Sequence, residues 1–177
     1  ESHDTRRMFE EFEGNIDALR QRYLFTAMFA TGVMIPMGFE YGFRKRLDVV
    51  TTVPKDWEEP NVDITDFITQ VNAIKDQTPA LAGEGRIDRL DYPDPAILVL
   101  RKHAINGPGQ ALLVLTKDPW NRQRFFTEDL YRLIKSPEPL RDLSPEWPMA
   151  ELPTPFEFWL GPGMARVLVA SQPQVAA

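Results

Sequence analysis

The stretch AILVLRKHAINGPGQALLVLTK, residues 96–117, decides the fold of the second half of the chain. Two aliphatic runs, at residues 96–102 and 110–117, flank the turn sequence Asn-Gly-Pro-Gly at residues 106–109. Runs of this length and composition are typical of strands, and the Gly and Pro residues between them mark a turn. The stretch therefore predicts an antiparallel β-hairpin.

Shorter segments downstream continue the β pattern. We expect strands at residues 124–127 and 130–134. Residues 156–160 and 165–170, separated by the turn sequence Gly-Pro-Gly, are expected to form a closing hairpin.

The region between these strands is rich in proline. Residues 136–155 contain six prolines, which predicts an irregular but ordered connection. Residues 171–177 are expected to be a frayed tail. We therefore predict an antiparallel β domain over residues 83–177, with its boundary near residues 82–86.

The first half of the chain has helical spacing. Asn15 is a plausible N-cap, and Gly32 is a plausible stop. Residues 33–37 then form a short apolar run, the pattern of a strand buried on both faces, followed by a glycine-bracketed turn at residues 38–42. The apolar positions of the helix are Ile16, Leu19, Tyr23 and Ala27.

A second helix is expected after the long irregular segment at residues 43–62. Asp63 can cap this helix, and it should end before Pro79. A helix, a buried strand, a loop and a helix together indicate an α/β unit with a parallel sheet. The apolar stripe of this second helix consists of Ile64, Phe67, Ile68, Val71 and Ile74.

The composition narrows the classes of partner. A net charge of -6 and a pI of about 5.0 argue against nucleic acid and against an anionic membrane surface. The apolar residues 23–39 do not indicate a membrane span, because Gly32 and Pro36 interrupt them. The absence of cysteine excludes disulfides and thiolate metal sites, and a cytoplasmic location is the default expectation.

The first four residues, ESHD, carry the strongest chemical signal. Ser2, His3 and Asp4 do not fit a serine-hydrolase triad, since consecutive residues of an extended segment point to alternating sides. A metal site is not expected either, because the second histidine, His103, lies in the other half of the chain. His3 and Asp4 instead suit the carboxyl end of a barrel strand, where catalytic groups of parallel α/β barrels gather.

Four motifs in this order resemble the α-amylase superfamily, the retaining family-13 glycoside hydrolases and transglycosylases. ESHD resembles the family's Asn-His-Asp region, and GFEYG at residues 38–42 resembles the turn after its eighth strand. Residues 67–81, ending QTPAL, are similar to the last barrel helix and the phrase that follows it. Residues 166–168 match the closing strand of the C-terminal β-sandwich.

The resemblance implies a fold of two classes, α/β plus all-β. Residues 1–82 would form the last two β/α units of a (β/α)8 barrel, and residues 83–177 an antiparallel β-sandwich. The implied substrate is an α-glucan or another oligosaccharide. We expect no cofactor, and the sequence gives no metal site; whether calcium is required stays open.

The resemblance also assigns roles to individual residues. Asp4 matches the third catalytic carboxylate, which binds sugar hydroxyls where the bond breaks, and His3 matches the histidine that contacts the same sugar. Glu40 and Tyr41 lie on the substrate-facing rim. Ser2 stands where the family usually has Asn.

The other two catalytic carboxylates of the family are missing from this sequence. A retaining glycosidase needs a nucleophile and an acid/base about 5 Å apart, and in this family they belong to earlier strands. The chain alone is therefore expected to be inactive. It also lacks an initiator Met, so we expect a piece of a longer protein that packs against the rest of the barrel or self-associates through the exposed barrel face.

Two alternatives stay open. Residues 48–59, which include Trp57, resemble glucan maltosyltransferases that use maltose 1-phosphate, although those enzymes usually have Thr-Pro-Asp in place of Ser-His-Asp. The basic residues 44–46 could bind such an anionic donor or could be a solvated patch. The second alternative is a non-catalytic glycan- or protein-binding module, whose glycan binding would be unaffected by Asp4→Asn.

Overall fold

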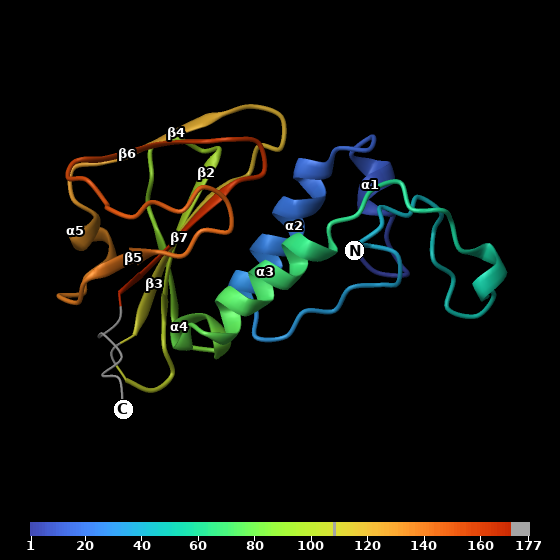
Figure 1. Cartoon of the computed structure of the whole chain (residues 1–177), viewed down its shortest axis with the longest axis horizontal. Coiled ribbons are helices and arrows are strands. Elements are labelled where there is room, and N and C mark those ends of the chain that lie inside the picture. Colours follow the sequence, from blue (N-terminus) through green and yellow to red (C-terminus); the bar gives the residue numbers. More distant parts are fainter. Residues whose placement is uncertain (108, 171–177) are drawn as a thin grey trace.

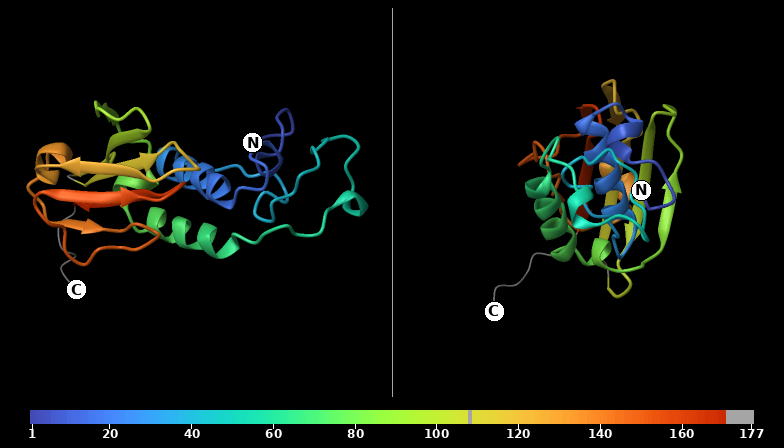
Figure 2. Two further views of the ribbon diagram at one scale, coloured as in Figure 1. Left: turned by 90° about the horizontal axis from the view of Figure 1, so that it is seen from above. Right: turned by 90° about the vertical axis from the view of Figure 1, so that its right-hand side faces the viewer.

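The structure, a computed structural model, describes residues 1–107 and 109–170. In these residues a helical layer, a five-stranded sheet and a two-stranded sheet are stacked (Figure 1, Figure 2). Every strand pair is antiparallel. The five-stranded sheet has the order β1-β2-β3-β7-β5, with β1 (Ile87–Leu90), β2 (Ile97–His103), β3 (Gln110–Thr116), β7 (Ala165–Ala170) and β5 (Leu140–Asp142); the smaller sheet pairs β4 (Gln123–Thr127) with β6 (Phe156–Leu160).

The predicted central hairpin is confirmed. Strands β2 and β3 pair antiparallel, with Ile97 opposite Thr116 and His103 opposite Gln110. Strand β3 also pairs with β7, so its backbone is bonded along both edges. Because both neighbours are antiparallel, the chain from β1 to β7 has the antiparallel β character that the sequence predicts.

The two faces of β3 enter two different cores. Ala111, Leu113 and Leu115 pack against the helical layer, whereas Leu112 and Val114 pack against β4, β6 and helix α5 (Leu130–Ile134). Successive strand residues point to opposite faces, so an unbroken apolar run is buried only when both faces are covered.

The helical layer covers one face of the central sheet (Figure 1). Asn15 caps α2 as expected, because its Oδ1 accepts hydrogen bonds from Asp17 N at 2.9 Å and Ala18 N at 3.2 Å. Asp63 accepts a bond from Thr65 N at 2.9 Å just before the second predicted helix. The helices are α1 (Met8–Glu11), α2 (Ile16–Phe29), α3 (Thr65–Asp76) and α4 (Pro79–Ala82), with a 3-10 turn η1 (Pro54–Asp56).

Buried Lys102 links the sheet to this layer. Its side chain leaves β2, is 1% exposed, and donates to Met28 O at 3.3 Å, Phe29 O at 3.1 Å and Leu81 O at 3.2 Å. These carbonyls lie in the last turns of α2 and α4, where the helix dipole favours a cation. Burial lowers the pKa of the ammonium group below its ordinary value.

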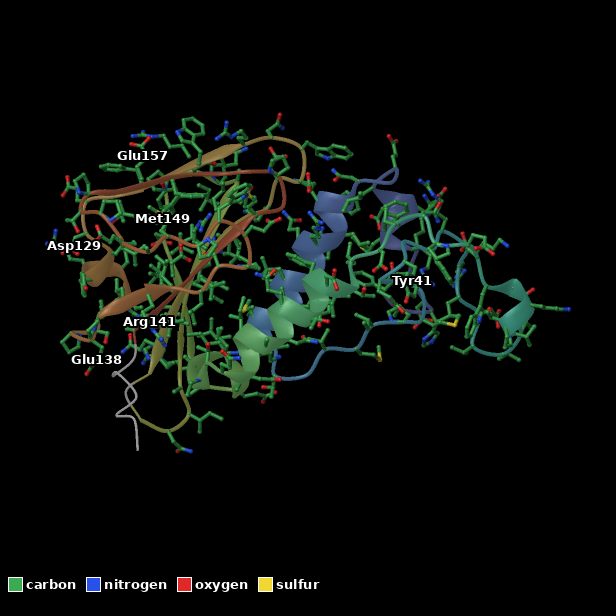
Figure 3. All side chains as sticks on the ribbon, viewed as in Figure 1. Tyr41, Asp129, Glu138, Arg141, Met149 and Glu157 are labelled. Atoms are coloured by element: carbon green, nitrogen blue, oxygen red, sulfur yellow. The ribbon has the colours of Figure 1, made fainter. Side chains whose placement is uncertain are left out.

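A buried ion pair stands on the opposite face of the sheet. The guanidinium of Arg166 on β7 donates to Asp142 Oδ2 at 3.0 Å and to Trp147 O at 2.7 Å, and it lies 3.6 Å from the ring centre of Phe158. Asp142 also accepts the Met149 N–H at 2.9 Å. This ion pair fixes the proline-rich connection to the sheet; Met149 is labelled in Figure 3.

Residues 33–37 do not form the predicted buried strand. Residues 33–36 have no regular secondary structure, Met37 begins a turn, and Met34 is 77% exposed. A parallel strand needs neighbours on the same sheet, and residues 1–82 supply none. Of the two expected β/α units at the barrel end, the structure therefore shows the helices but no parallel sheet.

Two further strand predictions are wrong. Residues 130–134 form helix α5, because Asp129 Oδ1 caps it through Tyr131 N at 2.8 Å and Lys135 ends it with φ 55°. Strands β6 and β7 exist but do not form a closing hairpin. Their short connection crosses between the sheets, so β6 pairs with β4 and β7 with β3.

The frayed tail expected at residues 171–177 lies outside the described residues. Among the described residues, no helix combines the length and hydrophobicity that crossing a membrane requires.

A charged cluster joins β1 to β2. Asp88 Oδ2 lies 2.7 Å from Arg101 Nη2, 3.0 Å from His103 Nε2 and 2.9 Å from Arg86 Nη2. The hydrogen bonds from His103 and then Arg101 hold the pKa of Asp88 well below its ordinary value of 3.8.

This cluster predicts a pH-dependent contribution to stability. Because the folded-state pKa of Asp88 is lowered, its interactions contribute fully above pH 3.8 and are lost as pH falls from there toward the folded-state pKa. Asp88→Asn should therefore lower the urea midpoint at pH 6, and the difference from wild type should shrink below pH 3.8. Asp91→Asn, on an exposed neighbouring carboxylate, serves as the control. An equal difference at both pH values would contradict the assignment.

Candidate active site

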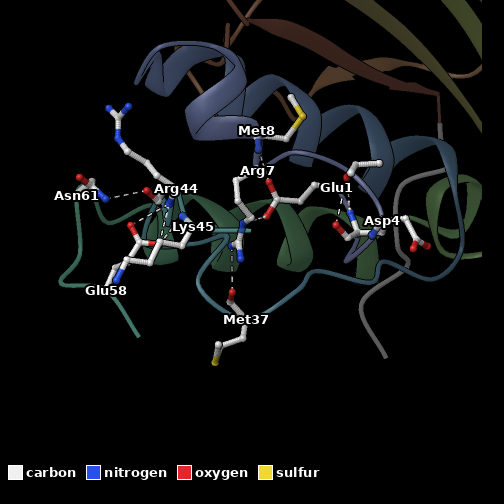
Figure 4. Close-up of polar contacts among 12 residues, drawn as sticks. Glu1, Asp4, Arg7, Met8, Met37, Arg44, Lys45, Glu58 and Asn61 are labelled. Atoms are coloured by element: carbon white, nitrogen blue, oxygen red, sulfur yellow. Dashed lines mark hydrogen bonds and ion pairs between the residues drawn. The ribbon is translucent and has the colours of Figure 1, made fainter. Parts of the chain in front are cut away.

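A buried ion pair fixes the N-terminal segment. Glu1 Oε1 lies 2.8 Å from Arg7 Nε, and both side chains are 2% exposed. Arg7 Nη2 donates to Met37 O at 3.0 Å, and Met8 N donates to the other Glu1 oxygen (Figure 4). Charges this deeply buried must be paired and hydrogen-bonded. The contacts therefore tie the first residues to the segment that precedes the 38–42 turn.

His3 and Asp4 project from this fixed segment into solvent. Their side chains are 48% and 77% exposed, and His3 Nε2 lies 3.2 Å from Asp4 Oδ2. The local turn is closed by Thr5 N, which donates to Ser2 O at 3.2 Å, and by Asp4 N, which donates to Ser2 Oγ at 3.2 Å. Ser2 therefore shapes the turn that presents Asp4.

The loop at residues 46–50 faces these two side chains. Together with His3 and Asp4 it lines an open cleft of about 330 Å³. Arg46 Nε donates to His3 O at 3.4 Å, which bridges the two walls. A second cleft of about 370 Å³ shares Arg46 and Asp48 and extends to Lys45 and Trp57.

Asp48 builds the wall opposite Asp4. Its Oδ1 accepts hydrogen bonds from Thr51 N at 2.8 Å and Val50 N at 2.9 Å. These backbone bonds, with that of Thr51 the largest, lower the pKa of Asp48 below its ordinary value. Asp48 is therefore ionised at neutral pH and is a poor general acid.

Glu40 and Tyr41 lie in the expected glycine-bracketed turn. Gly38 and Gly42 adopt φ values of +81° and +62°, in the left-handed region that favours glycine. The Tyr41 carbonyl accepts the Asn61 N–H at 3.0 Å, which closes the loop; Tyr41 is labelled in Figure 3. Neither Glu40 nor Tyr41 lines the two clefts around Asp4 and Asp48.

The chemistry available at the site follows from the cleft that contains Asp4. The exposed carboxylate can accept hydrogen bonds from hydroxyl groups, and the neighbouring imidazole can donate one to a hydroxyl oxygen. Among the described residues, no group of three or more His, Cys, Asp and Glu side chains could hold a metal ion.

Two parts of the site went unnoticed at the sequence level. Arg7 gives no signal beyond a charged residue close to Glu1. The loop at residues 46–50 does carry a sequence signal. The sequence DVVTT at residues 48–52 places an Asp before a turn, and from this position the Asp side chain can accept hydrogen bonds from backbone N–H groups.

Comparison with known proteins gives a partial sequence match. No family model matches the chain. A maltosyltransferase of Burkholderia pseudomallei (strain K96243), named alpha-1,4-glucan:maltose-1-phosphate maltosyltransferase, is 32% identical over 108 residues. The match covers 56% of this chain and 9% of that protein.

Solved structures share the fold at low identity. The cyclic alpha-maltosyl-(1→6)-maltose hydrolase of Arthrobacter globiformis matches with a TM-score of 0.64 at 20% identity, over 97% of this chain and 34% of that one. AmyP in complex with maltose matches with a TM-score of 0.66 at 14% identity, over 96% and 40%. The chain thus spans well under half the length of these proteins.

The Arg7 contacts predict the local stability of the site. Arg7→Lys keeps the charge but loses the paired geometry of the guanidinium. Amide exchange should accelerate about tenfold or more in residues 2–8 and 37–43, corresponding to hydrogen bonds of about 1.5–3 kcal/mol, while β3 and β7 stay protected. Arg6→Lys, on the exposed neighbour, should change nothing. Unchanged exchange in Arg7→Lys would show that the pair does not hold the segment.

Proposed function

We propose that this chain belongs to the α-amylase superfamily, where it resembles the C-terminal part of the enzymes, and that it forms one wall of an α-glucan active site. The reaction is cleavage or transfer of a glycosidic bond with retention. Asp4 is the third, transition-state-stabilising carboxylate, and His3 binds the same sugar. The observation that carries the proposal is the cleft in which Asp4 and His3 face residues 46–50.

The position of Asp4 suits this role. Its carboxylate is 77% exposed at the cleft, so a sugar can reach it, while the buried Glu1–Arg7 pair holds the backbone behind it. An acceptor that binds hydroxyls more strongly in an oxocarbenium-like transition state lowers the barrier. A rigid support makes that binding geometrically selective.

His3 supports Asp4 from the same turn. Its Nε2 lies 3.2 Å from Asp4 Oδ2, and its carbonyl receives the Arg46 Nε–H. The imidazole can therefore orient the carboxylate and donate to a neighbouring hydroxyl. Glu40 and Tyr41 remain candidates for outer contacts with a longer glucan.

The nucleophile and the acid/base are proposed to come from polypeptide outside this sequence. The solved relatives are longer than this chain, which matches 34–40% of their length. Exposed Met34 and Ile35, at 77% and 38%, give residues 33–37 an apolar surface for that remainder of the barrel or for a second copy. The chain alone is accordingly inactive.

The proposal predicts the effect of Asp4→Asn in the longer protein that contains this chain. Loss of the charge should lower kcat by about 10²-fold or more, since stabilising developing charge is worth several kcal/mol. Initial rates on maltoheptaose measure this. Asp66→Asn, on an exposed carboxylate of α3, should leave the rate unchanged. A normal kcat in Asp4→Asn would leave only a non-catalytic binding role for the cleft.

Transfer of maltosyl units from maltose 1-phosphate is a second candidate. The sequence match to a maltosyltransferase favours it. The cleft of about 370 Å³ is lined by Lys45 and Arg46 beside Trp57, and also by the carboxylates Asp48, Asp56 and Glu58. An anionic donor would have to bind at the two cations and avoid these carboxylates.

This second candidate predicts a donor-specific defect in the same longer protein. Lys45→Gln should raise the KM for maltose 1-phosphate about fivefold, equivalent to about 1 kcal/mol for a partly exposed charge pair, and leave the KM for maltoheptaose unchanged. Lys55→Gln, outside the clefts, is the control. Equal effects on both donors would rule out recognition of the phosphate by Lys45.

A further inference from the structure

A third cleft lies away from the Asp4 site, where three segments meet. It measures about 380 Å³ and lies between the start of α2, the β3–β4 connection and the β6–β7 turn. Figure 1 shows both connections beside the N-terminal end of α2. The cleft shares no lining residue with the clefts around Asp4. Its volume is within the usual range for small-ligand sites, about 300–1,000 Å³.

The walls of this cleft are braced to one another. Asn15 Nδ2 donates to Pro119 O at 2.9 Å, which ties the helix start to the β3–β4 connection. Gly163 N donates to Asp118 O at 3.4 Å, and a Cβ on Gly163 would lie 2.3 Å from Asp17 O. This close approach packs the β6–β7 turn against the first turn of α2.

Trp120 forms an exposed aromatic wall. Its side chain is 58% exposed, while its backbone is held by Asp118 Oδ1, which accepts Trp120 N at 2.8 Å and Asn121 N at 3.0 Å. In the part of the chain that the structure describes, no ring stacks on Trp120 and no cation lies over it. A large indole on a fixed backbone offers a stacking surface at little entropic cost.

Two carboxylates face the same space. Glu13 and Asp17 line the cleft, and neither side chain has a hydrogen-bond or ion-pair partner within residues 1–107 and 109–170. Glu13 is held at φ 52°, a conformation that non-glycine residues rarely adopt. The cleft therefore combines free acceptors with an aromatic face.

This combination selects the chemistry of the ligand. An anion would be repelled by the two carboxylates. A neutral pyranose can place its C–H face on the indole and donate its hydroxyl hydrogens to the carboxylate oxygens, in bonds strengthened by the charge of the acceptor. Pro119 and Pro162 add apolar contact beside the ring.

We propose that the cleft around Trp120, Glu13 and Asp17 is a second oligosaccharide-binding site, which holds a neutral glucan chain away from the Asp4 cleft. The indole and the two acceptors suit the C–H face and the hydroxyls of a pyranose; the choice of an α-1,4-glucan rests on the proposed function. Such a site retains a long substrate between encounters with the active site and raises its effective concentration there.

The test is a titration of the ¹⁵N-labelled chain with maltoheptaose, following the four tryptophan indole N–H signals by NMR. The Trp120 signal should shift saturably, and Asp4→Asn should keep that shift. Glu13→Gln should raise the maltoheptaose concentration at half-saturation. Trp120→Ala should raise it at least tenfold, as followed by backbone amides of α2 because the Trp120 signal is lost. Trp147→Ala, which removes an exposed indole elsewhere, should leave it unchanged.

The other outcomes separate this site from the proposed function. A saturable Trp120 shift with cellohexaose but not maltoheptaose would support the site and count against the α-glucan function. No Trp120 shift with either sugar would overturn the site, even if signals near Asp4 move. A Trp120 shift that depends on protein concentration without sugar would also overturn it and assign the cleft to contact between copies.

Discussion

The ammonium group of Lys102 joins the helical layer to the central sheet. It reaches from β2 into the core and binds carbonyls in the last turns of α2 and α4. Lys75 of α3 makes a similar contact, since its ammonium group donates to Ala30 O just past the end of α2. Burial lowers the pKa of both lysines, so these cations are tolerated only because helix C-termini surround them. These contacts, together with the apolar core that Leu19, Leu24 and Met28 share with the sheet, hold α2 in place.

Both candidate sites depend on where α2 lies. Its first turn forms one wall of the Trp120 cleft through Asn15 and Asp17. Residues 1–11 pack before it, and Arg7 ties them to the segment that follows the helix. The sheet thus acts as a support, and the exposed chemistry lies on turns at the edge of the helical layer. Catalytic and binding groups on loops held by a rigid scaffold follow the general pattern of globular proteins.

How far the sequence predicts this fold depends on how local each signal is. The central hairpin was predictable because its runs and turn adjoin each other, and Asn15 marked the start of α2. The pairing of β6 with β4 was not, since residues 156–160 are equally compatible with pairing to the adjacent strand. Helix α5 had a readable cap in Asp129, which an apolar pattern of five residues obscured. Residues 33–37 read as a buried strand, but pairing depends on neighbours that their own sequence does not encode.

The candidate site shows the same division. His3 and Asp4 could be singled out because their order among other motifs matched a known family. The support from Arg7 and the opposing loop at residues 46–50 depend on contacts across 30 and 43 positions, which no short pattern contains. Trp120 and Glu13 are ordinary surface residues in the sequence, and only the fold brings them to one cleft.

The most direct test of the central claim is a crystal structure, with a bound maltooligosaccharide, of the longer protein that we propose contains this chain. We predict a sugar ring between Asp4 and residues 46–50, with a hydroxyl oxygen within about 2.5–3.2 Å of the Asp4 carboxylate. A ring bound between the other two catalytic carboxylates, with Asp4 turned away and in contact with water alone, would contradict the assignment of this cleft as part of the active site.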